Sequence, residues 1–194
     1  MGRTPDPTRK PELLGRIMNH VAAEPLSRMT FRSLANALGV STYSFVYHFG
    51  SRQEMIDAIL EEGVRLQREA IVGVDVTTFD RQQFADWYKE SFRHSLRDAN
   101  RTALRLQFEA GALEPIDRDI GKRITASFAE WRDLVESWLV ARGVGPQRAP
   151  VLARWLADTA AGMHFGFLIT GDRDKTIEAF DVFLGAYLRE AFGD

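Results

Sequence analysis

One short segment of the chain concentrates hydroxyl and aromatic side chains of the kind that contact nucleic acids. In a helix that turns about 100° per residue, Tyr43 and Tyr47 lie nearly opposite Phe45, with Thr42 and Ser44 on the flanks. Hydroxyl groups form hydrogen bonds with phosphates and base edges, and aromatic rings pack on thymine methyl groups. The outward face of this segment therefore predicts contact with DNA.

Two short helices joined by a tight turn would position these side chains. Gly39 marks the turn, because a residue without a Cβ readily adopts the left-handed conformation, and Ser41 offers a hydroxyl that caps the second helix. The first helix is indicated by apolar residues at helical spacing, which are Phe31, Leu34, Ala35 and Leu38. This is the pattern of a helix-turn-helix, whose second helix enters the major groove while the first braces it. The competing interpretation is a small solvated helix in an ordinary helical bundle.

The run from Leu13 to Leu60 resembles the N-terminal domain of the tetracycline-repressor (TetR) family of bacterial transcriptional regulators. Its most specific piece is YHFGSRQEM, from Tyr47 to Met55, which is similar to that family's end of the recognition helix and capped start of the fourth helix. Ser51 and Glu54 have the spacing of a capping box, which has a physical basis of its own.

The resemblance implies contacts with the DNA backbone as well as with the bases. In the family a basic residue just after the cap approaches a phosphate, and Arg52 occupies that position. Thr30, at the start of the second helix, is similar to another backbone contact. The predicted DNA-binding residues are Thr30, Arg32, Ser41, Thr42, Tyr43, Ser44, Tyr47, His48 and Arg52.

Two positions depart from the family's pattern. Val46 stands where the family commonly has Tyr, so the phosphate hydrogen bond usually made there is missing. Tyr43 is bulky where relatives often have a small residue early in the recognition helix. These departures keep open an alternative function, a helical ligand carrier or protein-interaction adaptor that does not bind DNA.

The composition is that of a globular protein with one large or two modest domains, since 45% of its 194 residues are hydrophobic. The absence of Cys excludes disulfides and thiolate metal sites. The net charge of −2 is uneven, because residues 1–52 carry +4 and residues 53–194 carry −6. DNA would therefore be attracted to the N-terminal end.

Targeting segments and catalytic motifs are not apparent. No secretory signal is visible in the first residues, and the longest strongly apolar stretch, 160–169, is short and contains His164. The motifs HExxH, GxSxG and GxxxxGKS/T are absent, and four scattered His residues show no metal-ligand spacing. We therefore expect a cytoplasmic protein without membrane contact, enzymatic activity, cofactor or metal site.

Apolar periodicity along the whole chain predicts an all-α protein of nine helices with short connections. We expect a disordered tail over residues 1–9, a helix-turn-helix DNA-binding domain over 10–60, and a C-terminal effector-binding and dimerisation domain over 61–194. A long fourth helix, reaching about Ile71, would link the two domains, and Gly111 with Pro115 would interrupt the chain after the sixth helix. The later helices are predicted near 84–95, 100–108, 120–138, 152–167 and 177–188.

The last two helices carry apolar stripes together with small residues that allow close approach. Helix-turn-helix proteins bind DNA as twofold dimers whose reading helices lie about 34 Å apart, and the resemblance implies a four-helix dimer interface here. The predicted interface residues are Trp155, Met163, Phe167, Phe183 and Tyr187. The alternative is that these stripes face only the monomer's own core.

The remaining C-terminal helices are rich in large aromatic residues with a few polar groups among them, which suits a concave site for a mostly apolar small molecule. The predicted ligand-binding residues are Trp87, Tyr88, His94, Gln107, Phe108, Phe128, Trp131 and His164. The resemblance implies a pocket between the fifth and eighth helices. The competing interpretation is that these aromatic residues form packed core.

These features together predict a homodimeric, ligand-responsive DNA-binding transcriptional regulator. It would be a repressor that an apolar or aromatic small molecule releases from a palindromic or pseudo-palindromic double-stranded DNA operator. The effector would shift the dimer between competent and incompetent spacings of its reading helices, with the long fourth helix as the lever.

Overall fold

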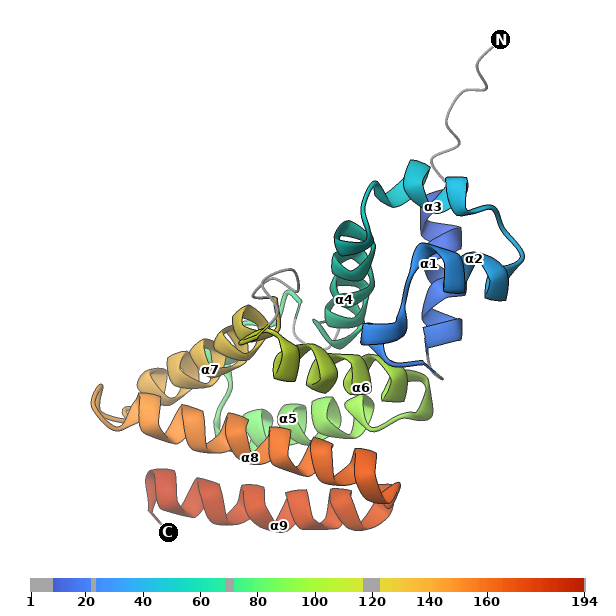
Figure 1. Ribbon diagram of the computed structural model, residues 1–194. Coiled ribbons are helices and arrows are strands. Elements are labelled where there is room, and N and C mark those ends of the chain that lie inside the picture. Colours follow the sequence, from blue (N-terminus) through green and yellow to red (C-terminus); the bar gives the residue numbers. More distant parts are fainter. Residues whose placement is uncertain (1–8, 22–23, 69–71, 117–122, 194) are drawn as a thin grey trace.

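The computed structural model describes residues 9–21, 24–68, 72–116 and 123–193, and its regular elements there are all helices, as predicted (Figure 1). They are α1 (Arg9–His20), η2 (Leu26–Arg28), α2 (Phe31–Leu38), α3 (Thr42–Phe49), α4 (Arg52–Arg68), η3 (Val76–Thr78), α5 (Arg81–Ser95), α6 (Asp98–Leu113), α7 (Arg123–Ala141), α8 (Ala149–Thr170) and α9 (Arg173–Phe192), where η marks a short 3-10 helix. The prediction of nine α-helices is thus confirmed over the described ranges.

The first four helices pack around a hydrophobic core of their own. Ile17 of α1, Leu34 of α2 and Phe45 of α3 are fully buried in it, because the apolar stripes of these short helices face one another. Helix α6 inserts Leu106 and Ala110 into the same core from the C-terminal half of the chain. The N-terminal helices are therefore seated on α6.

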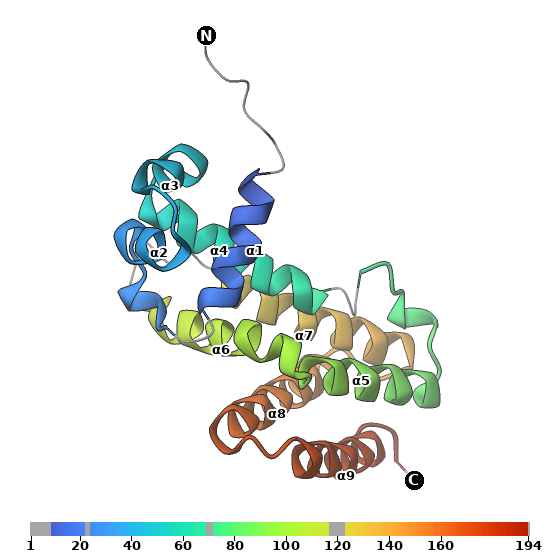
Figure 2. The ribbon, with the colours of Figure 1, turned by 90° about the vertical axis from the view of Figure 1, so that its right-hand side faces the viewer.

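A second core fills the space between α5, α7, α8 and α9, and stacked aromatic rings dominate it. Phe84 stacks on Trp138 with ring centroids 3.6 Å apart, and Phe92 stacks on Phe180 at 3.8 Å. Helices α8 and α9 run antiparallel along one side (Figure 1). Both views place them at the opposite end of the molecule from α3 (Figure 2).

Helix α6 is longer than the sequence indicated. It runs from Asp98 to Leu113, so the predicted end of this helix near Phe108 and Gly111 is wrong. Gly111 stays helical and serves packing instead, since a Cβ on it would lie 3.4 Å from Cγ2 of Ile124 in α7.

Parts of three predicted segments lie outside the described residues. These are residues 1–8 of the predicted tail, residues 69–71 at the predicted end of the fourth helix, and residues 117–122, which include the predicted start of the seventh helix. Arg9, predicted as the last residue of the tail, is the first residue of α1.

Candidate nucleic-acid interface and ligand cavity

Side-chain caps fix the starts of α2 and α3, and a glycine ends α2 at the turn between them. The Thr30 hydroxyl accepts a hydrogen bond from the Ser33 N–H (3.0 Å), and the Ser33 hydroxyl accepts one from the Thr30 N–H (3.0 Å). Gly39 ends α2 at a φ of 63°, in the left-handed region. The Ser41 hydroxyl caps α3 by accepting from the Ser44 N–H (3.2 Å), and the two serine oxygens also share a hydrogen bond (2.9 Å). The predicted helix-turn-helix is therefore present.

Helix α3 buries one face and exposes the other. Phe45 is 0% exposed and packs between Phe31 of α2 and Phe49, with ring centroids 5.8 and 6.2 Å away. Tyr43 and Tyr47 are 74% and 53% exposed on the opposite face. The predicted division of this helix is confirmed.

Three rings of α3 form a row, called here the tyrosine ridge, made of the exposed Tyr43 and Tyr47 and the half-buried His48. Tyr43 stacks on Tyr47 with centroids 6.4 Å apart, and His48 meets Tyr47 edge-on at 5.0 Å. Thr42 is exposed on the same helix. Rings that are already held in place lose little conformational entropy when they bind, so the ridge suits docking into a groove.

The two arginines predicted to contact phosphate have different surroundings. Arg32 is exposed and makes no ion pair or hydrogen bond with any residue that the structure describes. Arg52 donates from Nε to the Met29 carbonyl (2.7 Å) and from Nη2 to the Leu26 carbonyl (3.1 Å). Arg52 thus fastens the segment before α2 to the start of α4, a role that the sequence did not indicate. Its phosphate contact stays a prediction.

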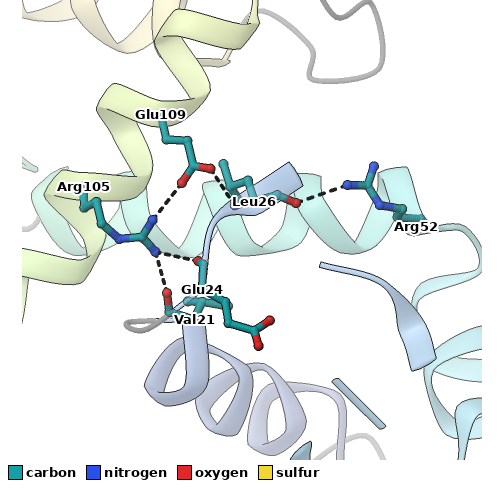
Figure 3. A network of polar contacts seen from close by, with 6 residues as sticks. All are labelled: Val21, Glu24, Leu26, Arg52, Arg105 and Glu109. Atoms are coloured by element: carbon teal, nitrogen blue, oxygen red, sulfur yellow. Dashed lines mark hydrogen bonds and ion pairs between the residues drawn. The ribbon is translucent and has the colours of Figure 1, made fainter. Parts of the chain in front are cut away.

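Two side chains of α6 also form hydrogen bonds with the backbone of the segment between α1 and α2 (Figure 3). Arg105 donates to the carbonyl oxygens of Val21 and Glu24, the latter at 3.1 Å, and Glu109 accepts from the Leu26 N–H at 2.6 Å. Arg105 and Glu109 are themselves paired at 2.7 Å. Nothing in the local sequence pattern predicts these contacts, because the bonded groups are backbone atoms about eighty residues away.

A cavity of about 90 Å³ lies between α5, α6, α7 and α8. The predicted ligand-binding residues that line it are Tyr88, His94, Gln107, Phe108, Phe128, Trp131 and His164. Trp87 lies outside this lining, since its ring packs against Phe79 and Trp131 with centroids 6.2 and 6.0 Å away. Ligand binding by the lining residues remains a prediction.

The polar side chains of the cavity carry amide, hydroxyl and imidazole groups. No Asp, Glu, Lys or Arg belongs to the described lining, which also includes Ser91, Ser95 and Asn100. The two serines share a helical stripe with Tyr88, a signal that could have identified them as lining residues. Such a lining favours an apolar or aromatic molecule with a few hydrogen-bonding groups.

His164 lines the cavity together with these polar side chains. Its Nε2 lies 2.6 Å from the Ser95 hydroxyl oxygen, and Phe92 stacks on its ring at a centroid distance of 4.6 Å. Burial lowers the pKa of His164 to about 4, so its ring is neutral at pH 7. Burial also raises the pKa of the Tyr88 phenol. The His164 ring and the Tyr88 phenol are therefore both uncharged at physiological pH.

No protein-family model matches the sequence, and no curated protein sequence matches it. Solved structures do match the arrangement of the helices. A transcriptional regulator from Rhodococcus sp. Rha1 has a TM-score of 0.78 at 17% identity, covering 93% of this chain and 96% of that chain. A TetR transcriptional regulator from Legionella pneumophila has a TM-score of 0.68 at 14% identity, covering 95% and 98% respectively. This chain has the TetR fold.

A third solved structure with the TetR fold was determined with a small molecule. It is a TetR variant from Acinetobacter baumannii AYE in complex with minocycline, with a TM-score of 0.59 at 19% identity, covering 95% of this chain and 98% of that chain.

The outer face of α8 and α9 is a further apolar surface of this TetR fold. Phe167 and Tyr187 are only 1% and 0% exposed, so both side chains belong to the monomer's core and are wrong as predicted interface residues. Trp155 is exposed, and Met163 and Phe183 are half-buried, so these three keep surface for a partner.

Other apolar side chains extend this outer face. Val151 and Ile169 of α8 and Val182 of α9 are exposed, and Val182 is 76% exposed. Gly162 of α8 and Ala186 of α9 are small and exposed beside them, which permits close approach of a second pair of helices. The sequence stripes had pointed to the inner faces of these helices rather than to this outer one.

Within the ranges that the structure covers, no three His, Asp or Glu side chains gather as a metal-binding group. No helix in those ranges is long and apolar enough to cross a membrane.

Proposed function

We propose that this protein is a homodimeric member of the TetR family that binds operator DNA through α3 and represses transcription until a small molecule binds. The observation that carries this proposal is the tyrosine ridge, whose two tyrosines are exposed while Phe45 beneath them is fully buried. Large aromatic rings that stay exposed do not stabilise the fold of the isolated chain, because apolar side chains stabilise a protein when they are buried. A DNA groove would cover them.

The division of labour on this surface follows from the chemistry of the side chains. Tyr43, Tyr47, Thr42 and Ser44 would lie near base edges, and Thr30, Arg32, His48 and Arg52 near phosphates. Because Arg32 has no partner among the described residues, it is available to a phosphate without breaking an existing ion pair.

A second copy of the chain would supply the second reading helix. The outer face of α8 and α9 is the proposed dimer interface, because its exposed apolar side chains surround small residues. Such an isologous interface places two identical reading helices about a twofold axis, and one turn of B-DNA sets their required separation at about 34 Å.

The effector would bind in the cavity between α5 and α8. Another protein with this fold binds minocycline in its crystal structure, which supports a small-molecule ligand here. The neutral polar groups and aromatic walls favour an apolar or aromatic molecule.

Helix α6 would transmit the binding of this effector to the DNA-binding helices. Leu104, Gln107 and Phe108 face the cavity, whereas Arg105 and Glu109 on the same helix hold the segment before α2. A ligand that displaces α6 must therefore strain or move that segment. By linkage, DNA would lower ligand affinity by the same factor by which the ligand lowers DNA affinity.

A mobility-shift assay on the DNA upstream of this chain's own coding sequence tests the proposal. We expect a sequence-selective complex with two chains per site, whose affinity falls as salt concentration rises. Arg32→Ala should weaken binding to every duplex and reduce the salt slope by about two, one for each chain of the dimer, whereas Tyr43→Ala should change sequence preference. A scrambled duplex of the same composition is the control, and binding to both duplexes alike at low salt would contradict operator recognition.

A ligand carrier or adaptor without DNA binding is the second candidate function. The observation that favours it is Val46, which is 48% exposed on α3 and has no hydroxyl to offer a phosphate. This candidate predicts that no duplex is shifted at any salt concentration while small molecules still bind.

A further inference from the structure

A second hollow continues outward from the cavity between α6, α7 and α8. Gln107, Phe108 and Phe128 form walls of both spaces. The outer hollow opens to solvent and brings in charged side chains, which the inner cavity does not have. One elongated molecule could therefore occupy both, with its two ends in different electrostatic surroundings.

Most of the charge in the outer hollow is already compensated. Arg154 is paired with Asp158 at 3.1 Å along α8. The Glu114 carboxylate accepts hydrogen bonds from the N–H groups of Ile124 (2.6 Å) and Thr125 (3.0 Å) at the start of α7. These groups keep their charges satisfied without a ligand.

Arg132 of α7 is the exception among the described lining residues. It is half-buried and makes no ion pair or hydrogen bond with any residue in the described ranges. Partial burial without a partner is unfavourable for a guanidinium, because lost hydration is not replaced. An anion placed against it would restore that hydrogen bonding, and a carboxylate matches the planar donor geometry of guanidinium.

We propose that the effector is an amphipathic organic acid, with an uncharged aromatic body in the inner cavity and a carboxylate at Arg132. The proposal rests on the proposed function and specifies its ligand class. The neutral His164 and a described lining without Lys or Arg exclude the charged end from the inner cavity, since an unpaired carboxylate would be desolvated there. Arg132 lines the outer hollow, where pairing with its guanidinium would offset the desolvation of the carboxylate.

The test compares two probes of one shape, 4-phenylbutyrate and its uncharged amide, by isothermal titration calorimetry on the full chain. We expect the acid to bind about tenfold more tightly than the amide, which corresponds to one charge-assisted pairing of about 1.4 kcal/mol. Arg132→Gln should reduce the affinity for the acid to that for the amide and leave the amide's affinity unchanged. Arg132→Lys should keep part of the preference, because the positive charge remains.

Arg148→Gln is the matched control, because Arg148 is an exposed arginine that pairs with Glu190 and belongs to the lining of neither the cavity nor the outer hollow. Its affinity for the acid should stay within about twofold of the parent's, and circular dichroism should show the same helicity in all variants. Equal binding of acid and amide, no binding of either probe, or an unchanged acid preference in Arg132→Gln would overturn the proposal.

The outcome separates this proposal from the regulatory function. A chain that shifts operator DNA but does not prefer the acid refutes only the carboxylate site. A chain that prefers the acid through Arg132 but binds no DNA supports the site and refutes the regulator.

Discussion

Arg32 and Arg52 are both exposed near the proposed DNA surface, yet only Arg52 is tied to the backbone of the N-terminal helices. Its guanidinium donates to the carbonyls of Leu26 and Met29, which precede α2. Two arginines close together in the fold can therefore differ in what they contribute to stability. A contact between Arg52 and DNA would be additional to its structural role.

At this scale we predict that Arg52→Ala lowers the free energy of unfolding by about 1–3 kcal/mol, because hydrogen bonds from a charged donor to two carbonyls are lost. Arg32→Ala should change it by less than about 0.5 kcal/mol, since no described partner is lost. Urea unfolding followed by circular dichroism measures both values. Equal destabilisation by the two substitutions would mean that the Arg52 contacts contribute nothing in solution.

Helix α6 is the element that belongs to both halves of the molecule. Leu104 is buried in the C-terminal core, while Leu106 and Ala110 are buried in the N-terminal core. Because its faces serve two cores, α6 cannot shift against one of them without disturbing the other. The sequence had suggested the fourth helix as the lever, and we propose α6 as a second link, from the cavity to the segment before α2.

Hydrogen exchange should show the effect of the hydrogen bonds that Arg105 and Glu109 of α6 make with the segment before α2. In the double variant Arg105→Gln with Glu109→Gln, we expect amide exchange in the segment around Leu26 to accelerate about tenfold, because bonds worth about 1.4 kcal/mol no longer oppose local opening. The matched control is Arg154→Gln with Asp158→Asn, an ion pair of the same spacing within α8. It should leave exchange at Leu26 unchanged, and similar acceleration in both variants would argue against a specific role for these hydrogen bonds.

The whole molecule separates its proposed activities along its length. Helix α3, which carries the tyrosine ridge, lies at one end of the molecule, and α8 and α9 lie at the other (Figures 1 and 2). The cavity is lined by residues of α5, α6, α7 and α8. A dimer formed through α8 and α9 would therefore leave both reading helices free, which is what simultaneous binding of two half-sites requires.

Val182→Glu should test this arrangement, because it puts a charge in the middle of the proposed interface. We expect the variant to sediment as a monomer and to lose at least about tenfold in operator affinity, since each half-site must then be bound separately. Val140→Glu, at a half-exposed valine on α7, is the control and should remain dimeric. A dimeric Val182→Glu variant, measured by analytical ultracentrifugation, would place the interface elsewhere.

Local sequence patterns predicted most of the helices well, because caps and turns act over short stretches of the chain. Thr30, Gly39, Ser41 and Ser51 act on backbone groups within a few residues, so their effects can be read from spacing alone. The errors arose where a residue's role depends on a distant neighbour. Gly111 suggested a helix end until Ile124 was seen to pack against it.

The sequence by itself determined the helices, their caps and which face of α3 is polar and aromatic, because helical periodicity and capping act over one or two turns. Only the tertiary structure decided that Phe167 and Tyr187 are core rather than interface, that the predicted ligand-binding residues other than Trp87 line one cavity, and that side chains of α6 hold the segment before α2. Those facts depend on how helices far apart in the chain pack against each other, and the apolar stripe of a helix does not specify its partner.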